Sequence, residues 1–151
     1  MKKNTLIFFM AVLAAMPAFG NTGSGNLGIG VILGEPTGIS AIYQLADTRH
    51  IAGAAAWSFS GKTSIHLHGD YLFYNRGIIE VDKGSLPLYY GLGARIRLGD
   101  NTRLGVRFPL GAAYELADTP LHFFFELVPI MELVPDIAIS GNAGIGLRYV
   151  F

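Results

Sequence analysis

The last eleven residues, 141–151 with the sequence GNAGIGLRYVF, alternate between two kinds of side chain. In a strand, successive side chains point to opposite faces. The larger apolar side chains would share one face: Ala143, Ile145, Leu147, Tyr149 and Phe151. The other face is mostly small or polar: Asn142, Gly144, Gly146, Arg148 and Val150. Because chain ends are usually frayed and polar, this pattern predicts a strand that needs its last residue.

The same period of two recurs through the rest of the chain, and no helical period does. Turn residues divide it into eight expected strands. These strands cover about 26–33, 38–46, 50–59, 64–74, 87–98, 102–116, 121–131 and 137–151. Most connections are of hairpin length, so strands that follow each other in sequence should pair antiparallel. Only the connection around 75–86 is longer.

The two faces of these strands differ in size. Strand 88–98 has Leu88, Tyr90, Leu92, Ala94, Ile96 and Leu98 on one face, and Tyr89, Gly91, Gly93, Arg95 and Arg97 on the other. An eight-stranded barrel has little room inside, so the face with glycines and charges should fill the interior. The large apolar face then points into lipid, and strands of about ten residues match a tilted membrane crossing. This disfavours a soluble lipocalin-like carrier and predicts an all-β, transmembrane, antiparallel up-and-down barrel.

The first twenty residues predict export. A basic start, MKKN, precedes the apolar run TLIFFMAVLAAM and the small residues Ala18 and Gly20, which is typical of a cleaved signal peptide. An uncleaved membrane anchor is the alternative, disfavoured by the short apolar run. We therefore expect a signal peptide at 1–20 and one barrel domain at 21–151. Cleavage leaves nine basic and eleven acidic residues, a net charge of −2, which gives no basic footprint for nucleic acid.

Outward-facing aromatic residues cluster at corresponding strand ends. An even number of strands puts both termini on one side, which is the periplasmic side in outer-membrane barrels. Aromatic residues form girdles at membrane interfaces, and one girdle is expected from Tyr43, Tyr71, Phe73, Tyr90, Tyr114, Phe123, Tyr149 and Phe151. Trp57 and Phe59 should lie near the opposite rim.

The segment GLRYVF, from Gly146 to Phe151, resembles the C-terminal targeting signal of bacterial outer-membrane proteins. Gly146, Tyr149 and Phe151 are its expected key residues, and the resemblance implies recognition by the barrel-assembly machinery, with periplasmic chaperones during biogenesis. The whole mature chain is similar to the small OmpA/OmpX-type barrels of Gram-negative bacteria. The stretches GEPTG (34–38), DYLFYN (70–75) and LPLYYGLGARIR (86–97) resemble an uncharacterised subgroup of them. The outer loops are short, which disfavours adhesion and receptor roles.

The interior should contain a network of charged and polar side chains. Its predicted members are His66, His68, Asp70, Arg95, Arg107, Glu115, Glu126 and Arg148. Buried charges must pair whatever the function, so we interpret them, with Arg97, as an internal plug of ion pairs. A metal held by His66, His68 and Asp70 is the alternative. We expect no metal and no cofactor; with no cysteine in the chain, a thiolate site is excluded.

Two features leave a second function open. Pro109 and Pro129 fall inside neighbouring strands, where proline cannot donate to the ladder; they predict a bulge, a kink or a lateral gap toward lipid. Ser58 and Ser64 lie near His66, as a lipid esterase would require, although no known motif matches.

The favoured prediction is an outer-membrane barrel with a plugged lumen and a structural envelope role, without enzymatic activity, embedded in lipid and lipopolysaccharide. The alternative is a barrel that modifies or binds lipid A or another acyl lipid.

Overall fold

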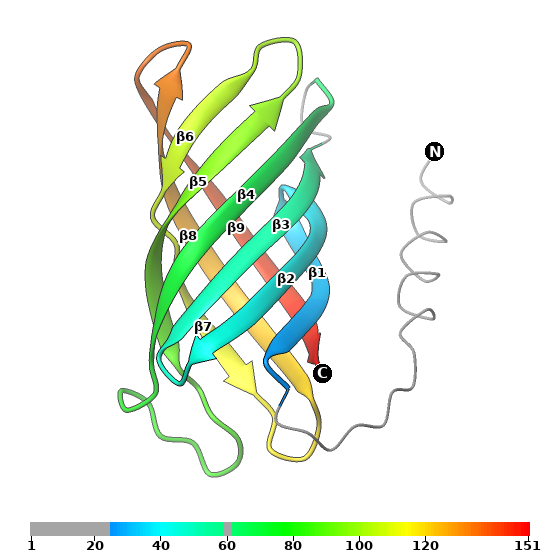
Figure 1. Ribbon diagram of the computed structural model, residues 1–151, viewed down its shortest axis with the longest axis vertical. Helices are drawn as coiled ribbons and strands as arrows, with labels where there is room; N and C mark the ends of the chain where they lie inside the picture. The colour runs from blue at the N-terminus through cyan, green and yellow to red at the C-terminus, as the bar shows by residue number, and fades with distance from the viewer. Residues whose placement is uncertain (1–24, 59–61) are drawn as a thin grey trace, which may run out of the picture.

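A computed structural model describes residues 25–58 and 62–151. Figure 1 shows a single closed barrel of tilted strands. The strands are β1 (Leu27–Glu35), β2 (Thr37–Ala46), β3 (Arg49–Ser58), β4 (Ser64–Asn75), β5 (Leu88–Leu98), β6 (Arg103–Arg107), β7 (Leu110–Glu115), β8 (Leu121–Val134) and β9 (Ala138–Val150). No helix among the described residues is long and apolar enough to cross a membrane. The expected signal peptide at 1–20 and Phe59 lie outside the described residues.

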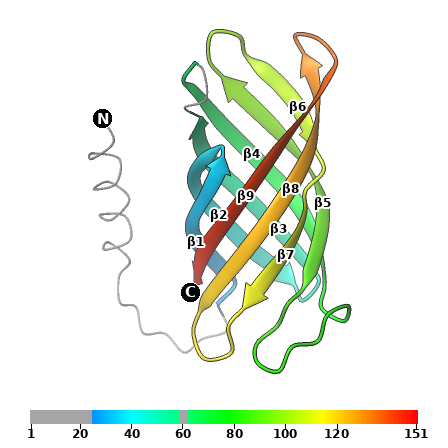
Figure 2. The same cartoon turned by 180° about the vertical axis from the view of Figure 1, so that it is seen from behind.

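Apart from β6 and β7, strands that follow each other in sequence pair antiparallel, and the ring closes between the first and the last strand. In that closing pair, Gly28 lies opposite Val150 and Glu35 lies opposite Ala143. The Phe151 N–H then donates to the Leu27 carbonyl at 2.8 Å. The segments β6 and β7 share one place in the ring, between β5 and β8. The predicted all-β, antiparallel up-and-down barrel of eight strands is therefore confirmed (Figures 1 and 2).

The sixth predicted strand is interrupted at Phe108 and Pro109, which separate β6 from β7. The register does not change across this break, because Arg107 pairs with Ile130 and Leu110 pairs with Leu127. The expected bulge is absent at this place; the irregularity in the β6–β8 pair lies between Leu104 and Gly105 instead. The interruption is a local loss of ladder bonds at a proline, with the strand continuing in line beyond it.

The two faces are sorted as the alternation predicts. Ile145 on the outer face of β9 is 57% exposed, whereas Arg148 on the inner face is 4% exposed. The outer surface carries leucine, isoleucine and aromatic side chains from all strands. Near the end that holds the C-terminus, the Phe73 ring stacks on Tyr90 at 5.5 Å, and Tyr149 contacts Phe151 edge-on at 5.1 Å. Trp57 lies near the other end of the barrel, one residue before the end of β3.

The longest connection between described strands, residues 76–87, lies at the end of the barrel that holds the C-terminus (Figure 1). It is attached to the strand wall. Ser85 and Glu115 exchange backbone hydrogen bonds of 2.9 and 2.8 Å, and the Tyr114 hydroxyl donates to the Lys83 carbonyl at 3.1 Å. The end of this connection therefore continues the pairing of β5 with β7 in the same register.

Candidate functional site in the barrel interior

Arg107, at the end of β6, is the centre of a buried charge network. It is 1% exposed. Its Nε and Nη2 donate to the two carboxylate oxygens of Asp70 at 2.8 and 3.1 Å, and Nη2 also lies 3.3 Å from Glu126 Oε1. The Tyr89 hydroxyl donates to Glu126 Oε2 at 2.8 Å, and His68 Nε2 lies 3.8 Å from Asp70. One arginine thus faces two carboxylates, and both are hydrogen-bonded.

Interior glycines allow these side chains to meet across an intervening strand. Gly93 of β5 lies in register between Asp70 and Arg107. A Cβ atom at Gly93 would lie 1.9 Å from Asp70 Oδ1, so any larger residue would displace the carboxylate. Gly111 of β7 likewise lies between Tyr89 and Glu126, and a Cβ there would lie 2.5 Å from the Tyr89 hydroxyl oxygen.

A second buried pair lies farther from the C-terminal end. Arg95 of β5 forms an ion pair with Glu132 of β8 across Gly105. Ser140 donates to Glu132 at 2.8 Å, and Asn142 Oδ1 lies 3.4 Å from Arg95 Nη1. Nearby, Arg97 Nε donates to the Ser64 hydroxyl at 3.1 Å. These polar contacts occupy the interior between the Arg107 network and the far rim.

An apolar layer lies on the other side of the Arg107 network. Along β4, the buried Leu72 and Tyr74 follow Asp70 toward the C-terminal end. The apolar layer is part of a buried cluster in which Ile32 and Ala52 lie beside the network itself. The whole cluster comprises Ile32, Ile42, Ala52, Leu72, Tyr74, Tyr89, Ala113 and Phe124. Tyr74 of β4 and Tyr89 of β5 lie opposite each other, and their rings stack with centroids 4.9 Å apart. Ions crossing the barrel would meet this layer and then the charge network.

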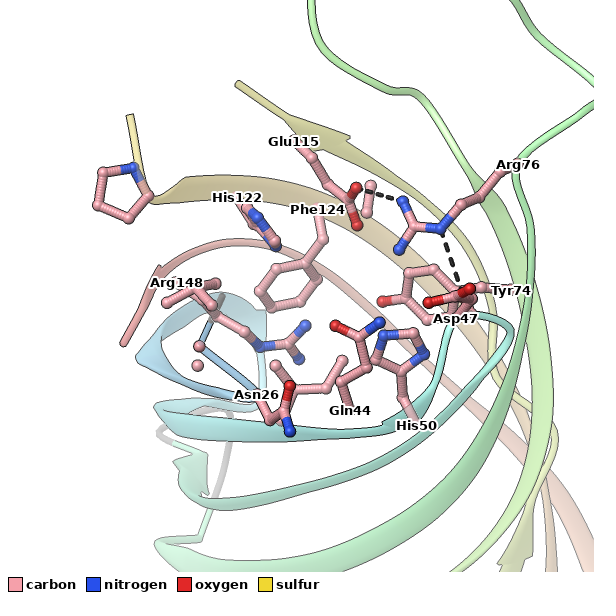
Figure 3. A pocket seen from close by; sticks show the side chains of 16 residues that line it. Asn26, Gln44, Asp47, His50, Tyr74, Arg76, Glu115, His122, Phe124 and Arg148 are labelled. Carbon is pink, nitrogen blue, oxygen red and sulfur yellow. Dashed lines mark hydrogen bonds and ion pairs between the residues drawn. The ribbon is translucent and has the colours of Figure 1, made fainter. Parts of the chain in front are cut away.

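Beyond the apolar layer, a pocket of about 510 Å³ opens at the end that holds the C-terminus (Figure 3). Arg76 lies at its rim, where it forms an ion pair with Glu115 and donates to the Asp47 carbonyl at 3.3 Å. Arg148 lines the pocket from β9. Its Nε and Nη2 both donate to Ser40 Oγ, at 3.1 and 2.8 Å, and its guanidinium carbon lies 3.8 Å from the centre of the Phe124 ring.

The interior holds all eight residues of the predicted network but divides them. Arg107 forms ion pairs with Asp70 and Glu126, and His68 lies beside Asp70. Glu115 and Arg148 lie in the pocket instead, where Glu115 pairs with Arg76 and Arg148 bonds to Ser40. Arg95 pairs with Glu132, which lies just beyond the expected strand 121–131, because β8 runs to Val134. Arg76 was also missed, because it follows β4 in a connecting segment.

The remaining sequence-based candidates lie near the far end. Ser64 Oγ is 3.0 Å from His66 Nε2, but His66 Nδ1 has no hydrogen-bond partner among the described residues. The acid that would orient the histidine of a hydrolytic triad is therefore missing there, and Ser58 donates to Glu35. Within the described chain, no group of three or more histidine, aspartate or glutamate side chains is placed to hold a metal ion.

Pro129 of β8 faces the break between β6 and β7, which contains Pro109, while the Pro109 carbonyl faces β5. The Phe108 N–H donates to the Pro129 carbonyl at 2.9 Å, and the Gly91 N–H donates to the Pro109 carbonyl at 2.9 Å. Each proline lacks the N–H that would make the reciprocal bond. Two ladder bonds are thus missing, while pairing continues on both sides of them.

Replacing both prolines with alanine should change stability only slightly. The restored donors could add about 0.5–1.5 kcal/mol per bond, and the greater freedom of the unfolded chain would offset about 0.4–1 kcal/mol per proline. We expect a shift in the free energy of unfolding of about 1 kcal/mol, measured by urea unfolding in lipid vesicles, with cellular lipid A unaltered. Altered lipid A in cells carrying the double variant would instead favour a lipid gate.

The fold is that of small up-and-down β-barrels. The structure is similar to the crystal structure of the N-terminal β-barrel domain of Pseudomonas aeruginosa OprF, with a TM-score of 0.59 and 14% sequence identity. The match covers 83% of this chain and 95% of that domain. No protein-family model and no curated protein matches the sequence. The resemblance to OmpA-type barrels is thereby confirmed for the fold.

Proposed function

We propose that this chain is a small integral outer-membrane β-barrel with a closed interior and a structural role in the cell envelope, without enzymatic activity. The outer surface supports the location, because leucine and isoleucine side chains such as Leu92 and Ile51 are about half exposed on it. In a closed barrel the backbone N–H and C=O groups of every strand form hydrogen bonds with neighbouring strands, so they need no water, as a bilayer requires. The expected signal peptide and the aromatic cluster near the C-terminus agree with insertion from the periplasmic side.

The observation that supports the structural role is the set of buried ion pairs and apolar side chains in the barrel interior. The Arg107 network and the adjoining apolar layer span the barrel between the C-terminal pocket and the far rim. A cavity in this region, beside His68 and Arg107, has a volume of about 10 Å³. That is at most enough for a single water molecule. A barrel filled in this way is a rigid element of the membrane and a poor pore.

The purified protein in planar lipid bilayers should therefore show no stable single-channel currents. Passage of a hydrated ion would require the Arg107 ion pairs to separate, and separating buried charges is costly. The control is an open porin inserted under the same conditions. Stable, large currents from the unmodified protein would contradict a closed interior.

The alternative role, binding or modification of an acyl lipid, is favoured only by the Ser64–His66 contact and the missing ladder bonds at Pro109 and Pro129. Mass spectrometry of lipid A from cells with and without the protein separates the two proposals. The structural role predicts identical lipid A species. A species that depends on the protein, and disappears in a Ser64→Ala variant, would favour the enzyme.

A further inference from the structure

The pocket at the C-terminal end contains a buried cation without an acidic partner. Arg148 is 4% exposed and forms no ion pair with any described carboxylate. The two other fully buried arginines differ, because Arg107 faces two carboxylates and Arg95 faces one, while Arg97 near the far rim is only half-buried. Buried charges are normally paired. Ser40 and the Phe124 ring offset part of the cost, but neither supplies a negative charge.

The position of Arg148 leaves it available to a ligand. It reaches Ser40 across Gly30, which lies in register between β9 and β2. Both hydrogen bonds to Ser40 come from Nε and Nη2, and Nη1 takes part in neither of them. In Figure 3 the guanidinium extends from β9 toward the middle of the pocket.

A polar atom without a hydrogen-bond partner lies in the same pocket. His50 of β3 is buried, and its Nδ1 has no hydrogen-bond partner among the described residues. Its ring is held against Tyr74 at a centroid distance of 4.1 Å, so its orientation is fixed. Gln44 and His122 also line the pocket and can donate hydrogen bonds.

The acidic groups of the pocket do not compensate Arg148. Glu115 forms an ion pair with Arg76, and Asp47 is exposed on the turn at the rim. The volume of about 510 Å³ lies in the range of small-molecule sites. We propose that this pocket binds a small oxyanion, a carboxylate or phosphate group of a soluble molecule, with Arg148 as its charge partner and His50 as a hydrogen-bond donor.

Binding can be tested on the full mature protein in nanodiscs of zwitterionic lipid, with acetate and inorganic phosphate as probes at constant ionic strength. The readout is the NMR resonance of each arginine Nε–H. We expect a saturable shift at Arg148 and none at Arg95 or Arg107, which lie in the filled interior. No saturable shift, or equal shifts at all three arginines, would overturn the proposal. A shift produced only by anionic lipid in the nanodisc would overturn its assignment to a soluble ligand.

Variants make the test specific to the pocket. Arg148→Gln should abolish the saturable binding, read from neighbouring backbone amides. His50→Phe keeps a ring against Tyr74 and removes the donor, so it should fold even if Arg148→Gln does not. Loss of one hydrogen bond to a charged group corresponds to about a tenfold or greater weakening of binding. The matched control is His66→Phe, near the opposite end, which should bind as the unmodified protein does. Unchanged binding in His50→Phe would contradict the assigned site.

Discussion

Replacing Arg107 with alanine should destabilise the folded barrel by about 3–5 kcal/mol or more, because removal of one partner of a buried ion pair leaves an uncompensated charge. Here two carboxylates would be left, since Arg107 bonds to both Asp70 and Glu126. The free energy of unfolding, measured by urea titration in lipid vesicles, should fall by this amount. The barrel should also lose its resistance to heat in gel electrophoresis.

The matched control is the exposed ion pair between Lys62 and Asp100, whose side chains are 84% and 65% exposed. Lys62→Ala removes the same kind of contact at the surface, where such pairs contribute about 0–1 kcal/mol. A combined variant, Arg107→Met with Asp70→Asn and Glu126→Gln, tests the cause, because it removes the arginine and both charges left behind. It should recover most of the lost stability. Equal losses in Arg107→Ala and Lys62→Ala would show that the network does not stabilise the barrel.

The alternation of side chains in the sequence predicts the barrel and the direction of each face, because both follow from the backbone period of a strand. Ile145 outside and Arg148 inside illustrate this. The alternation stays in phase even through the break at Pro109, since the register is unchanged there. A single wrong residue in the count would have reversed the inner and outer faces of every later strand.

The pairing of the interior charges could not be predicted in the same way. Two of the buried ion pairs join side chains two strands apart, across a glycine: Arg107 reaches Asp70 across Gly93, and Arg95 reaches Glu132 across Gly105. Which side chains meet in this way depends on the register of two successive hairpins. An error of one residue in the predicted strand limits changes that register and assigns the wrong partner. The glycines indicate scarce interior space, and in the structure they mark the places where side chains cross.

The pocket was missed for a related reason. Arg148 and Glu115 share the interior face of their strands, and the sequence suggests that they join the other charges. The structure inserts the apolar layer around Phe124 between them and Arg107. Glu115 forms its ion pair with Arg76, which lies in a connecting segment. The conformation of that segment cannot be predicted from any periodic pattern in the sequence. Arg148 is left without an acid, and its position in the alternation does not reveal this.

Deletion of Phe151 should greatly reduce the amount of assembled barrel in cells while lowering the stability of the folded barrel only modestly. The deletion removes one closing hydrogen bond, from the Phe151 N–H to the Leu27 carbonyl, worth about 1 kcal/mol. The pairing of β1 with β9, from Gly28–Val150 to Glu35–Ala143, remains. If the terminal aromatic is also the signal for the assembly machinery, cells should lose far more barrel than this energy explains, and unfolded chain should pass to periplasmic proteases.

The measurement compares the fraction of heat-modifiable barrel in cells with the fraction that refolds from urea into lipid vesicles. The control Tyr43→Ala removes an aromatic that is 48% exposed near the same end of the barrel and should assemble normally. Equal barrel levels in cells with and without Phe151 would show that the last residue is not an assembly signal.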